Sequence, residues 1–319
     1  MIDPKEILQA KERIAPYIKK TPLVHSDYLS TLCKGEVYLK LENQQITNSF
    51  KIRGAFNRLL TLTDDEIKKG IITASSGNHA QAIGVSSEKL NISAKIIVPI
   101  NTPKIKLEKI RKFKVELVLF GDDYDETELK ALELVKKEKR TYVSAYNDKW
   151  IIAGQGTIVP EIYEEIPQVD SVFVPIGGGG LIAGIAIAMK DKDPKVKVIG
   201  IQTEACPTMF ESIKAGKIID IEMFDSIADG VWGGIEKGSI TFDIVRDFVD
   251  EILVVTEESI KKAVSILWKK EEILAEASGA FSIIPILNNP ENFKDKAVVC
   301  IISGGNIDKE LFDEIITHY

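Results

Sequence analysis

Four short segments of this sequence carry residue types that can do chemistry. Lys51 supplies a primary amine, residues 75–78 supply serine and asparagine side chains, Gly177–Gly180 is a run of four glycines, and Ser303 begins a further serine and glycine segment. A neutral lysine amine attacks aldehydes or accepts a proton, and glycine-rich turns bind anions through backbone N–H groups. The sequence therefore predicts a reactive lysine beside an anion-binding loop.

Lys51 is expected at the junction of a strand and a helix. Residues 36–42 alternate polar and apolar side chains, as a strand does, and apolar residues recur at helical spacing between residues 55 and 60. With Ser49 as the predicted N-cap, the Lys51 ammonium lies in the first helical turn, where the helix dipole disfavours its charge. This setting favours the neutral amine.

The other three segments follow predicted strands over residues 71–74, 171–176 and 297–302. In open α/β sheets a ligand binds in the crevice beyond the carboxyl ends of the strands. We therefore expect the four segments at one site. The N–H groups of the glycine run and of the helix after it would form a cradle for a phosphate.

The elements that position these segments alternate between helix and strand. An amphipathic helix is predicted over residues 4–20, and a short strand and helix over residues 21–35. Further strands are predicted at residues 94–99, 115–120, 141–144, 196–201 and 251–255. This pattern is typical of an α/β fold with two open, twisted, mostly parallel sheets flanked by helices.

Composition limits the classes of function. The chain has 319 residues, of which 45% are hydrophobic, and this suits one large or two ordinary domains. The formal charge of -7 argues against nucleic acid or an anionic membrane as the main partner. Cys33, Cys206 and Cys300 lack metal-ligand spacing, and there is neither a signal-peptide core nor an apolar run of roughly 18 residues. We expect a cytoplasmic protein without a metal site.

Several phosphate sites compete to explain the glycine run. A P-loop ATPase needs Gly-Lys-Ser/Thr at its end, where this chain has Leu181 and Ile182. A Rossmann site is a closer rival because Gly178, Gly180 and Ala183 match its relaxed spacing, but it leaves Lys51 and the serine segments without a role. Pyridoxal phosphate, an aldehyde-bearing phosphate, uses all four segments.

Together the segments resemble the fold-type II pyridoxal-phosphate enzymes, most closely the threonine dehydratase (threonine ammonia-lyase) and serine racemase branch. The resemblance runs from Thr21 to about Asp308 and keeps the family's order of motifs. The motifs are residues 49–55, 75–79, 153–157, 177–181, 228–230, 276–280 and 303–308. The resemblance implies a tryptophan synthase β-like fold. We expect residues 1–56 and 148–319 to form a large cofactor-binding domain and residues 57–147 a small domain.

The resemblance also implies roles for single residues toward the cofactor. Lys51 would hold the cofactor covalently and then remove the substrate's α-proton, and Ser303 would face the pyridine nitrogen. A hydroxyl does not hold this nitrogen protonated, so the ring is a weaker electron sink, which suits elimination better than transamination. The other expected cofactor contacts are Phe50, Asn78, Gly177, Gly178, Gly179, Gly180, Leu181, Gly230 and Glu276.

The segment 75–78 is expected to bind the substrate. Ser75, Ser76, Gly77 and Asn78 form an anion-binding turn that would take the substrate carboxylate. Ser76 also corresponds to the serine that faces the substrate from the side opposite the lysine in serine racemase, so racemisation is a further expected activity. His79 is expected to be structural.

The expected function is removal of water and ammonia from L-threonine first and L-serine second, giving a 2-oxo acid, with a place in isoleucine biosynthesis. A serine or other amino-acid racemase and a hydroxyaspartate dehydratase are alternatives on the same machinery. From other classes, an NAD-binding dehydrogenase and a cofactor-binding protein without turnover are alternatives, although the second would be expected to lose some of Lys51, Asn78 and Ser303. We expect a homodimer or homotetramer with an amino-acid substrate and with no nucleic-acid or membrane partner.

Three features depart from the family pattern. Asn48 stands where many relatives have glycine. Gln202 and Thr208 align where cation-binding relatives place carboxylates, with a backbone carbonyl at Cys206 and Glu204 nearby, which puts a divalent-metal site in doubt. The chain ends at Tyr319, so we expect no C-terminal regulatory domain and no feedback inhibition by isoleucine through one.

Overall fold

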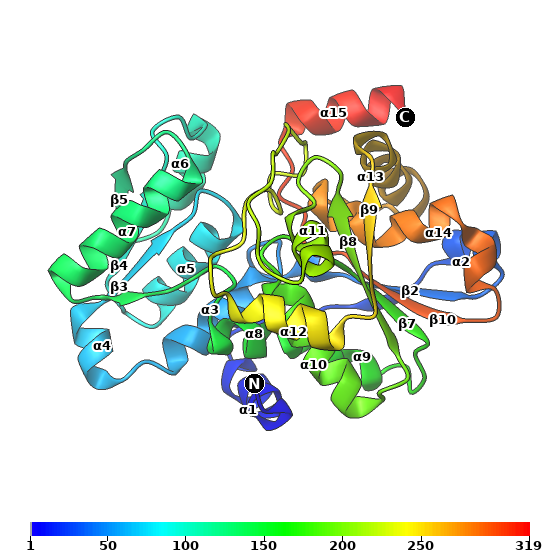
Figure 1. The fold of residues 1–319 in the computed structure, drawn as a ribbon, viewed down its shortest axis with the longest axis horizontal. Coiled ribbons are helices and arrows are strands. Elements are labelled where there is room, and N and C mark those ends of the chain that lie inside the picture. Colours follow the sequence, from blue (N-terminus) through cyan, green and yellow to red (C-terminus); the bar gives the residue numbers. More distant parts are fainter. Residues whose placement is uncertain (1) are drawn as a thin grey trace.

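A computed structural model describes residues 2–319 and shows two sheets flanked by helices (Figure 1). The six-stranded sheet has the order β1-β2-β10-β7-β8-β9 and the four-stranded sheet the order β5-β4-β3-β6. β1 runs antiparallel to β2, whereas the other neighbouring strands in the described residues are parallel. The prediction of two mostly parallel open sheets is confirmed.

The strands of the six-stranded sheet are β1 Leu23–His25, β2 Glu36–Lys40, β7 Ser171–Pro175, β8 Lys197–Thr203, β9 Glu251–Val255 and β10 Ala297–Ile301. Those of the four-stranded sheet are β3 Ile71–Ala74, β4 Ala94–Val98, β5 Glu116–Leu119 and β6 Thr141–Tyr142. Apart from β1, which was expected only as a short strand within residues 21–35, each lies within two residues of its predicted bounds at either end. Strand patterns are local, and a strand buried on both faces, such as β4 or β7, forms a short apolar run that is readily recognised.

The helices before β7 are α1 Pro4–Ile14, α2 Asp27–Cys33, α3 Lys51–Leu60, α4 Asp64–Lys69, α5 Asn78–Lys89, α6 Lys104–Arg111, α7 Tyr124–Glu138, α8 Lys149–Gly156 and α9 Ile158–Tyr163. Those after β7 are α10 Gly180–Lys192, α11 Thr208–Ala215, α12 Ile240–Phe248, α13 Glu257–Glu271, α14 Ile284–Asn288 and α15 Lys309–His318. Short 3₁₀ helices are η1 Glu42–Gln44, η2 Ser278–Ile283 and η3 Pro290–Phe293.

The first helix is shorter than the sequence predicts. A helix over residues 4–20 was expected, but α1 ends at Ile14. Pro16 has no N–H to continue the hydrogen-bond ladder and its ring crowds the preceding turn, so the chain leaves the helix there. Ile18 nevertheless packs against the core around the four-stranded sheet, which explains the helix-like apolar spacing.

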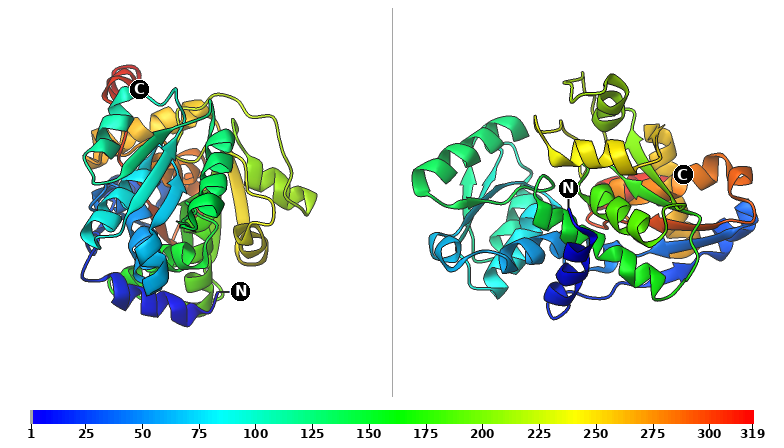
Figure 2. Two further views of the ribbon diagram at one scale, coloured as in Figure 1. Left: turned by 90° about the vertical axis from the view of Figure 1, so that its left-hand side faces the viewer. Right: turned by 60° about the horizontal axis from the view of Figure 1, so that its bottom comes forward.

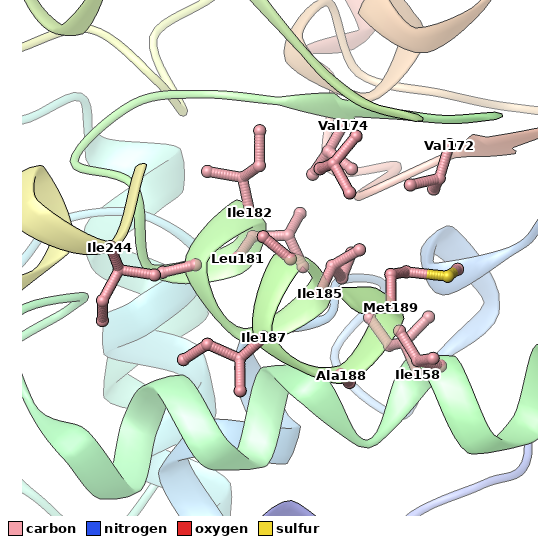
Figure 3. Packing of buried hydrophobic residues seen from close by; sticks show 14 of the residues in the cluster. Ile158, Val172, Val174, Leu181, Ile182, Ile185, Ile187, Ala188, Met189 and Ile244 are labelled. Carbon is pink, nitrogen blue, oxygen red and sulfur yellow. The ribbon is translucent and has the colours of Figure 1, made fainter. Parts of the chain in front are cut away.

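Helix α10 is the most buried helix near the glycine run. Its residues from Gly180 to Met189 are all buried. Figure 3 shows Ile182, Ile185 and Met189 of α10 packed beneath Val172 and Val174 of β7. The helix that follows the glycine run is therefore held by the core of the six-stranded sheet.

Helices α3 and α8 lie between the two sheets (Figures 1 and 2). Ile52, Phe56 and Leu59 of α3 belong to the same apolar core as Ile71 and other residues of the four-stranded sheet. The domain boundary predicted after residue 56 falls inside α3, and the division into a large and a small domain stays a prediction.

Glycines let the backbones of α3, α8 and α10 touch. A Cβ on Gly154 of α8 would lie 2.6 Å from the Gly54 Cα of α3, and a Cβ on Gly184 of α10 would lie 2.3 Å from the Ile152 carbonyl oxygen of α8. Since α3 begins at Lys51 and α10 follows the glycine run, α8 sets the distance between them.

Candidate active site

The residues predicted to bind cofactor and substrate line one cavity of about 360 Å³ at the carboxyl ends of β3 and β7. From α3 and the 75–78 segment they are Phe50, Lys51, Ser75, Ser76, Gly77 and Asn78. From the rest of the chain they are Gly177, Gly178, Gly179, Gly180, Leu181, Gly230, Glu276 and Ser303. The four segments that are distant in sequence are thus brought together as expected.

Lys51 is the first residue of α3. Its Nζ donates to the Ala145 carbonyl oxygen at 3.0 Å and lies 5.3 Å from the centroid of the Phe50 ring. Burial lowers the pKa of Lys51 to about 8, although the nearby Glu276 carboxylate opposes this shift. Removal of the ammonium from water is the cause of the lowered pKa.

The prediction that Ser49 caps α3 is wrong. Phe50 precedes the helix without a side-chain cap, and the Ser49 hydroxyl is buried with no hydrogen-bond partner. The segment pairs instead with the loop after β10, because Ser49 forms an antiparallel bridge with Gly304 and the Phe50 N–H donates to the Ser303 carbonyl at 3.1 Å. This pairing turns the Ser49 side chain away from the capping position and brings the Ser303 loop beside Lys51.

Asn48 has a φ of 53°, in the left-handed region that favours glycine. Asparagine adopts this conformation more readily than most residues. The departure from glycine at this position therefore needs no change in the path of the chain.

The glycine run forms a tight turn between β7 and α10. Gly179 has a φ of 88°, which only glycine adopts freely. A Cβ on Gly178 would lie 2.5 Å from the ring of Tyr146, and one on Gly180 would lie 2.9 Å from the Tyr146 Cα. The turn therefore leaves backbone N–H groups and the N-terminus of a 13-residue helix at the cavity, as a phosphate cradle requires.

The 75–78 segment connects β3 to α5. The Ser75 N–H donates to the Ile97 carbonyl at 3.1 Å and the Gly77 N–H donates to the Ser75 hydroxyl at 3.3 Å. The next residue, Asn78, begins α5, so the first turn of this helix also faces the cavity. This geometry suits an anionic group such as a carboxylate.

Glu276 is a buried carboxylate at the cavity wall. It accepts hydrogen bonds from the Asn78 Nδ2 at 2.9 Å and from the Ser278 hydroxyl at 2.9 Å. Burial raises the pKa of Glu276, and these donors oppose the shift. The position of Asn78 therefore depends on a group nearly two hundred residues away in the sequence.

His79 is buried behind the same segment. Its Nε2 lies 3.4 Å from the Val143 carbonyl oxygen. Burial, together with the charge of Lys51, lowers the pKa of His79 to about 3. The imidazole is therefore neutral over the physiological range.

Sequence reasoning missed several residues of the cavity. Tyr146 fills the space that side chains on Gly178 and Gly180 would need, and its hydroxyl accepts from the Glu236 N–H at 2.8 Å. Asn306 donates to the Asn78 Oδ1 at 2.7 Å. Asn306 lies inside the recognised 303–308 motif, which was the available signal, whereas Tyr146 has no motif around it.

Gln202 and Thr208, which align with the carboxylates of cation-binding relatives, form hydrogen bonds within the protein. The Gln202 side-chain oxygen accepts from the Phe210 N–H at 2.8 Å, and the Thr208 hydroxyl donates to the Gly233 carbonyl at 3.2 Å. Among the side chains that the structure describes, no three from His, Cys, Asp or Glu gather closely enough to hold a metal ion. No helix in the residues that the structure describes is long and apolar enough to cross a membrane.

The cavity fits pyridoxal phosphate. Lys51 presents an amine whose lowered pKa makes the neutral form accessible, Gly178 and Gly180 of the glycine turn lie against Tyr146 with no room for a Cβ, and the hydroxyl-bearing Ser303 lines the same cavity. Lys51 suits the aldehyde of this cofactor, the glycine turn its phosphate and Ser303 its ring nitrogen.

Comparison with known proteins gives consistent matches. A family model described as pyridoxal-phosphate dependent enzyme matches residues 14–304. The chain is similar to the catabolic L-threonine dehydratase TdcB of Escherichia coli, with 42% identity over 312 residues that cover 97% of this chain and 94% of that protein.

Solved structures show the same similarity. Maize serine racemase superposes with a TM-score of 0.92 and 31% identity, covering 99% of this chain and 98% of that one. The processed form of threonine deaminase isoform 2 from Solanum lycopersicum superposes with a TM-score of 0.91 and 33% identity, covering 99% and 94% of the two chains.

Proposed function

The chain belongs to the pyridoxal-phosphate-dependent enzyme family, and on that premise we propose that it is a threonine ammonia-lyase. L-Threonine is the preferred substrate and L-serine the second. The observation that carries the proposal is the convergence of Lys51, the glycine cradle and Ser303 in one cavity. The relatives named threonine dehydratase and threonine deaminase support the substrate.

The overall reaction releases one water molecule and later consumes one, so its net change in water is zero. Removal of the α-proton and the β-hydroxyl from L-threonine releases water and leaves an enamine, whose hydrolysis consumes water and gives 2-oxobutanoate and ammonia. Bound pyridoxal phosphate supplies the electron sink for the charge that develops at the α-carbon. The protein has to bind the substrate, remove the proton and orient the groups.

Each part of the cavity has a task in this proposal. The Lys51 amine removes the α-proton, and the first turn of α5 with Ser75, Ser76 and Gly77 binds the carboxylate. The glycine run with Leu181 would hold the phosphate, Phe50 and Gly230 would border the ring, and Asn78 would donate to the phenolic oxygen. The Ser303 hydroxyl would face the pyridine nitrogen, and because a hydroxyl does not hold this nitrogen protonated, elimination would be favoured over transamination.

Racemisation of serine is the second candidate. It is favoured by the position of Ser76 in the same cavity as Lys51 and by the similarity to maize serine racemase. In this candidate Ser76 returns a proton to the face opposite Lys51. Formation of D-serine beside pyruvate from L-serine tests it in the assay described below.

The wider setting of the enzyme is also part of the proposal. The Escherichia coli relative is named catabolic, which favours threonine degradation over the isoleucine biosynthesis expected from the sequence. A homodimer or homotetramer and a cytoplasmic location remain predictions. An amino acid is the proposed small-molecule partner.

The test is release of 2-oxo acid by purified protein supplied with pyridoxal phosphate, from L-threonine and L-serine in parallel. We expect 2-oxobutanoate from threonine, and we expect Lys51→Ala to lower turnover by about 10²- to 10⁴-fold because a general base is lost. Lys68→Ala, at the exposed end of α4, is the control and should keep full activity.

Two results would contradict the proposal. Absence of 2-oxo acid from both amino acids while the protein carries the cofactor would exclude the lyase. Full turnover by Lys51→Ala, in a buffer without amines, would exclude the assignment of the base.

A further inference from the structure

The side-chain amide of Asn78 divides its hydrogen bonds between two neighbours. Its Nδ2 donates to the two Glu276 oxygens at 2.9 and 3.1 Å, and its Oδ1 accepts from the Asn306 Nδ2 at 2.7 Å. An amide nitrogen carries two N–H donors. One N–H serves both carboxylate oxygens because they flank it, so the second N–H of Asn78 is available for another acceptor.

The orientation of Asn306 is set by a backbone carbonyl. Its Nδ2 also donates to the Thr47 carbonyl oxygen at 2.8 Å. A carbonyl oxygen only accepts hydrogen bonds, so a flipped Asn306 amide would oppose two oxygens at this contact. Asn306 must therefore present its NH₂ group to both Thr47 and Asn78, and Asn78 must present its oxygen to Asn306.

Glu276 alone does not set the orientation of Asn78. Burial raises the pKa of Glu276, and a protonated carboxyl group donates as well as accepts. Either orientation of the Asn78 amide would then find a partner there. The constraint that holds in both protonation states comes from Thr47 through Asn306.

We propose that Asn306 is a positioning residue that fixes the Asn78 amide so that a donor, and not an acceptor, is presented to the cofactor. The proposal rests on the proposed function, because it concerns the same cofactor site. The phenolic oxygen of pyridoxal phosphate is an acceptor, so a flipped Asn78 would place oxygen against oxygen. The Asn306 side chain acts on cofactor binding through Asn78, and its backbone N–H donates to Glu276 at 3.1 Å.

A double-mutant cycle on cofactor affinity tests this coupling. The dissociation constant of pyridoxal phosphate is measured for apo-protein as wild type, Asn306→Ala, Asn78→Ala and the double variant. We expect Asn306→Ala to weaken binding by roughly 10- to 100-fold, as loss of an orienting partner does at other sites. The double variant should bind no more weakly than Asn78→Ala alone. Losses that multiply in the double variant would overturn the proposal.

Two further variants separate orientation from general damage. Asn306→Asp keeps the size of the side chain but removes both N–H donors, so it should weaken binding at least as much as Asn306→Ala; binding as tight as the wild type would overturn the proposal. This variant also carries the test if Asn306→Ala does not fold.

Asn48→Gly removes the 3.5 Å contact to the Asn306 Oδ1. Asn48 is exposed, and its backbone has a positive φ that glycine adopts freely. The affinity of this variant should equal that of the wild type, and a loss as large as that of Asn306→Ala would count against the donor-specific role.

The binding measurement is independent of turnover. If wild-type protein binds pyridoxal phosphate and the cycle shows coupling, but threonine and serine give no product, the proposed function fails and the role of Asn306 stands. If product forms and the cycle shows no coupling, the role of Asn306 fails and the proposed function stands.

Discussion

Burial affects the pKa values of Lys51 and His79 more than neighbouring charge does. The Lys51 ammonium loses contact with water, and its pKa falls to about 8 despite the attraction of Glu276. A neutral form at moderate pH is what attack on an aldehyde and abstraction of an α-proton both require. Burial also lowers the pKa of His79 to about 3, so His79 is neutral. Of these two bases, Lys51 has the pKa closer to neutral pH.

The rate at which apo-protein takes up pyridoxal phosphate should report this pKa. The neutral fraction of Lys51 rises with pH and is nearly complete above its pKa, so the rate should rise about tenfold per pH unit below pH 8 and level off above it. Visible absorbance of the bound cofactor, followed in time at each pH, measures the rate. A rise that continues to the ordinary lysine pKa of 10.5 would contradict the shift.

Glu276→Gln is the matched variant for the pH profile. It removes the carboxylate that raises the pKa of Lys51 while keeping the size of the side chain. The profile should move to lower pH. A move to higher pH would mean that Glu276 does not act on Lys51 through its charge.

At the scale of elements, α8 determines how far the reactive lysine lies from the phosphate cradle. Gly54 and Gly154 bring α3 against α8, and Gly156 and Gly184 bring α8 against α10. The Gln155 side-chain oxygen also accepts from the Gly54 N–H at 3.2 Å. The contacts of Gly154 with Gly54 and of Gly184 with Gly156 are between backbones, which cannot yield as side chains do, so the three helices form one rigid unit.

Gly184→Ala should destabilise the protein and weaken cofactor binding, although alanine favours a helix. The propensity gain is about 1 kcal/mol, whereas overpacking costs about 1–3 kcal/mol and the new Cβ would lie 2.3 Å from a carbonyl oxygen. The overpacking should therefore exceed the gain. Urea unfolding of the apo-protein and the pyridoxal phosphate dissociation constant measure the two effects.

Ala188→Gly, on the same helix, is the control for this variant. It loses about 1 kcal/mol of helix propensity but adds no atom between α8 and α10. Its affinity for the cofactor should be unchanged. Equal loss of affinity in both variants would show that helix stability, and not spacing, controls the cradle.

At the scale of the whole molecule, a buried group of charges fixes α3 between the two sheets. The Arg53 guanidinium donates to Glu42 at 2.7 Å and to Glu161 at 2.7 Å, and Lys40 donates to Glu161 at 2.6 Å. Although burial opposes ionisation of Glu42, Arg53 and then Lys40 hold its pKa below the ordinary value. Two cations and two anions balance, and they join β2, η1, α3 and α9.

Arg53→Met should lower the free energy of unfolding by about 3–5 kcal/mol, because it leaves Glu42 and Glu161 buried without the guanidinium. Urea unfolding of the apo-protein measures the change. Arg246→Ala is the control, because this arginine pairs with Asp243 and Asp247 at the surface and its removal should cost at most about 1 kcal/mol. Equal small losses in both variants would mean that the buried charges do not hold α3.

The sequence by itself determined the elements and the chemistry-bearing segments. Strands such as β3 and β7 are short apolar runs, and the glycine run and the 75–78 segment stand directly after them. These are local features, because side-chain periodicity and the need for small residues in tight turns act within a few positions. Local features also predicted that the segments after β7 and β10 meet, since parallel strands of one sheet end at one edge, whereas the 75–78 segment follows β3 of the other sheet.

Tertiary structure alone decided which distant residues hold the site in place. Arg53 bonds to Glu161, 108 positions away in the sequence, and Asn78 bonds to Glu276, 198 positions away. The periodicity of side chains within an element does not predict such pairs. The wrong cap at Ser49 has the same origin, because the loop after β10 pairs with that segment and turns the hydroxyl away. The pKa of Lys51 likewise follows from the burial that only the assembled cavity creates.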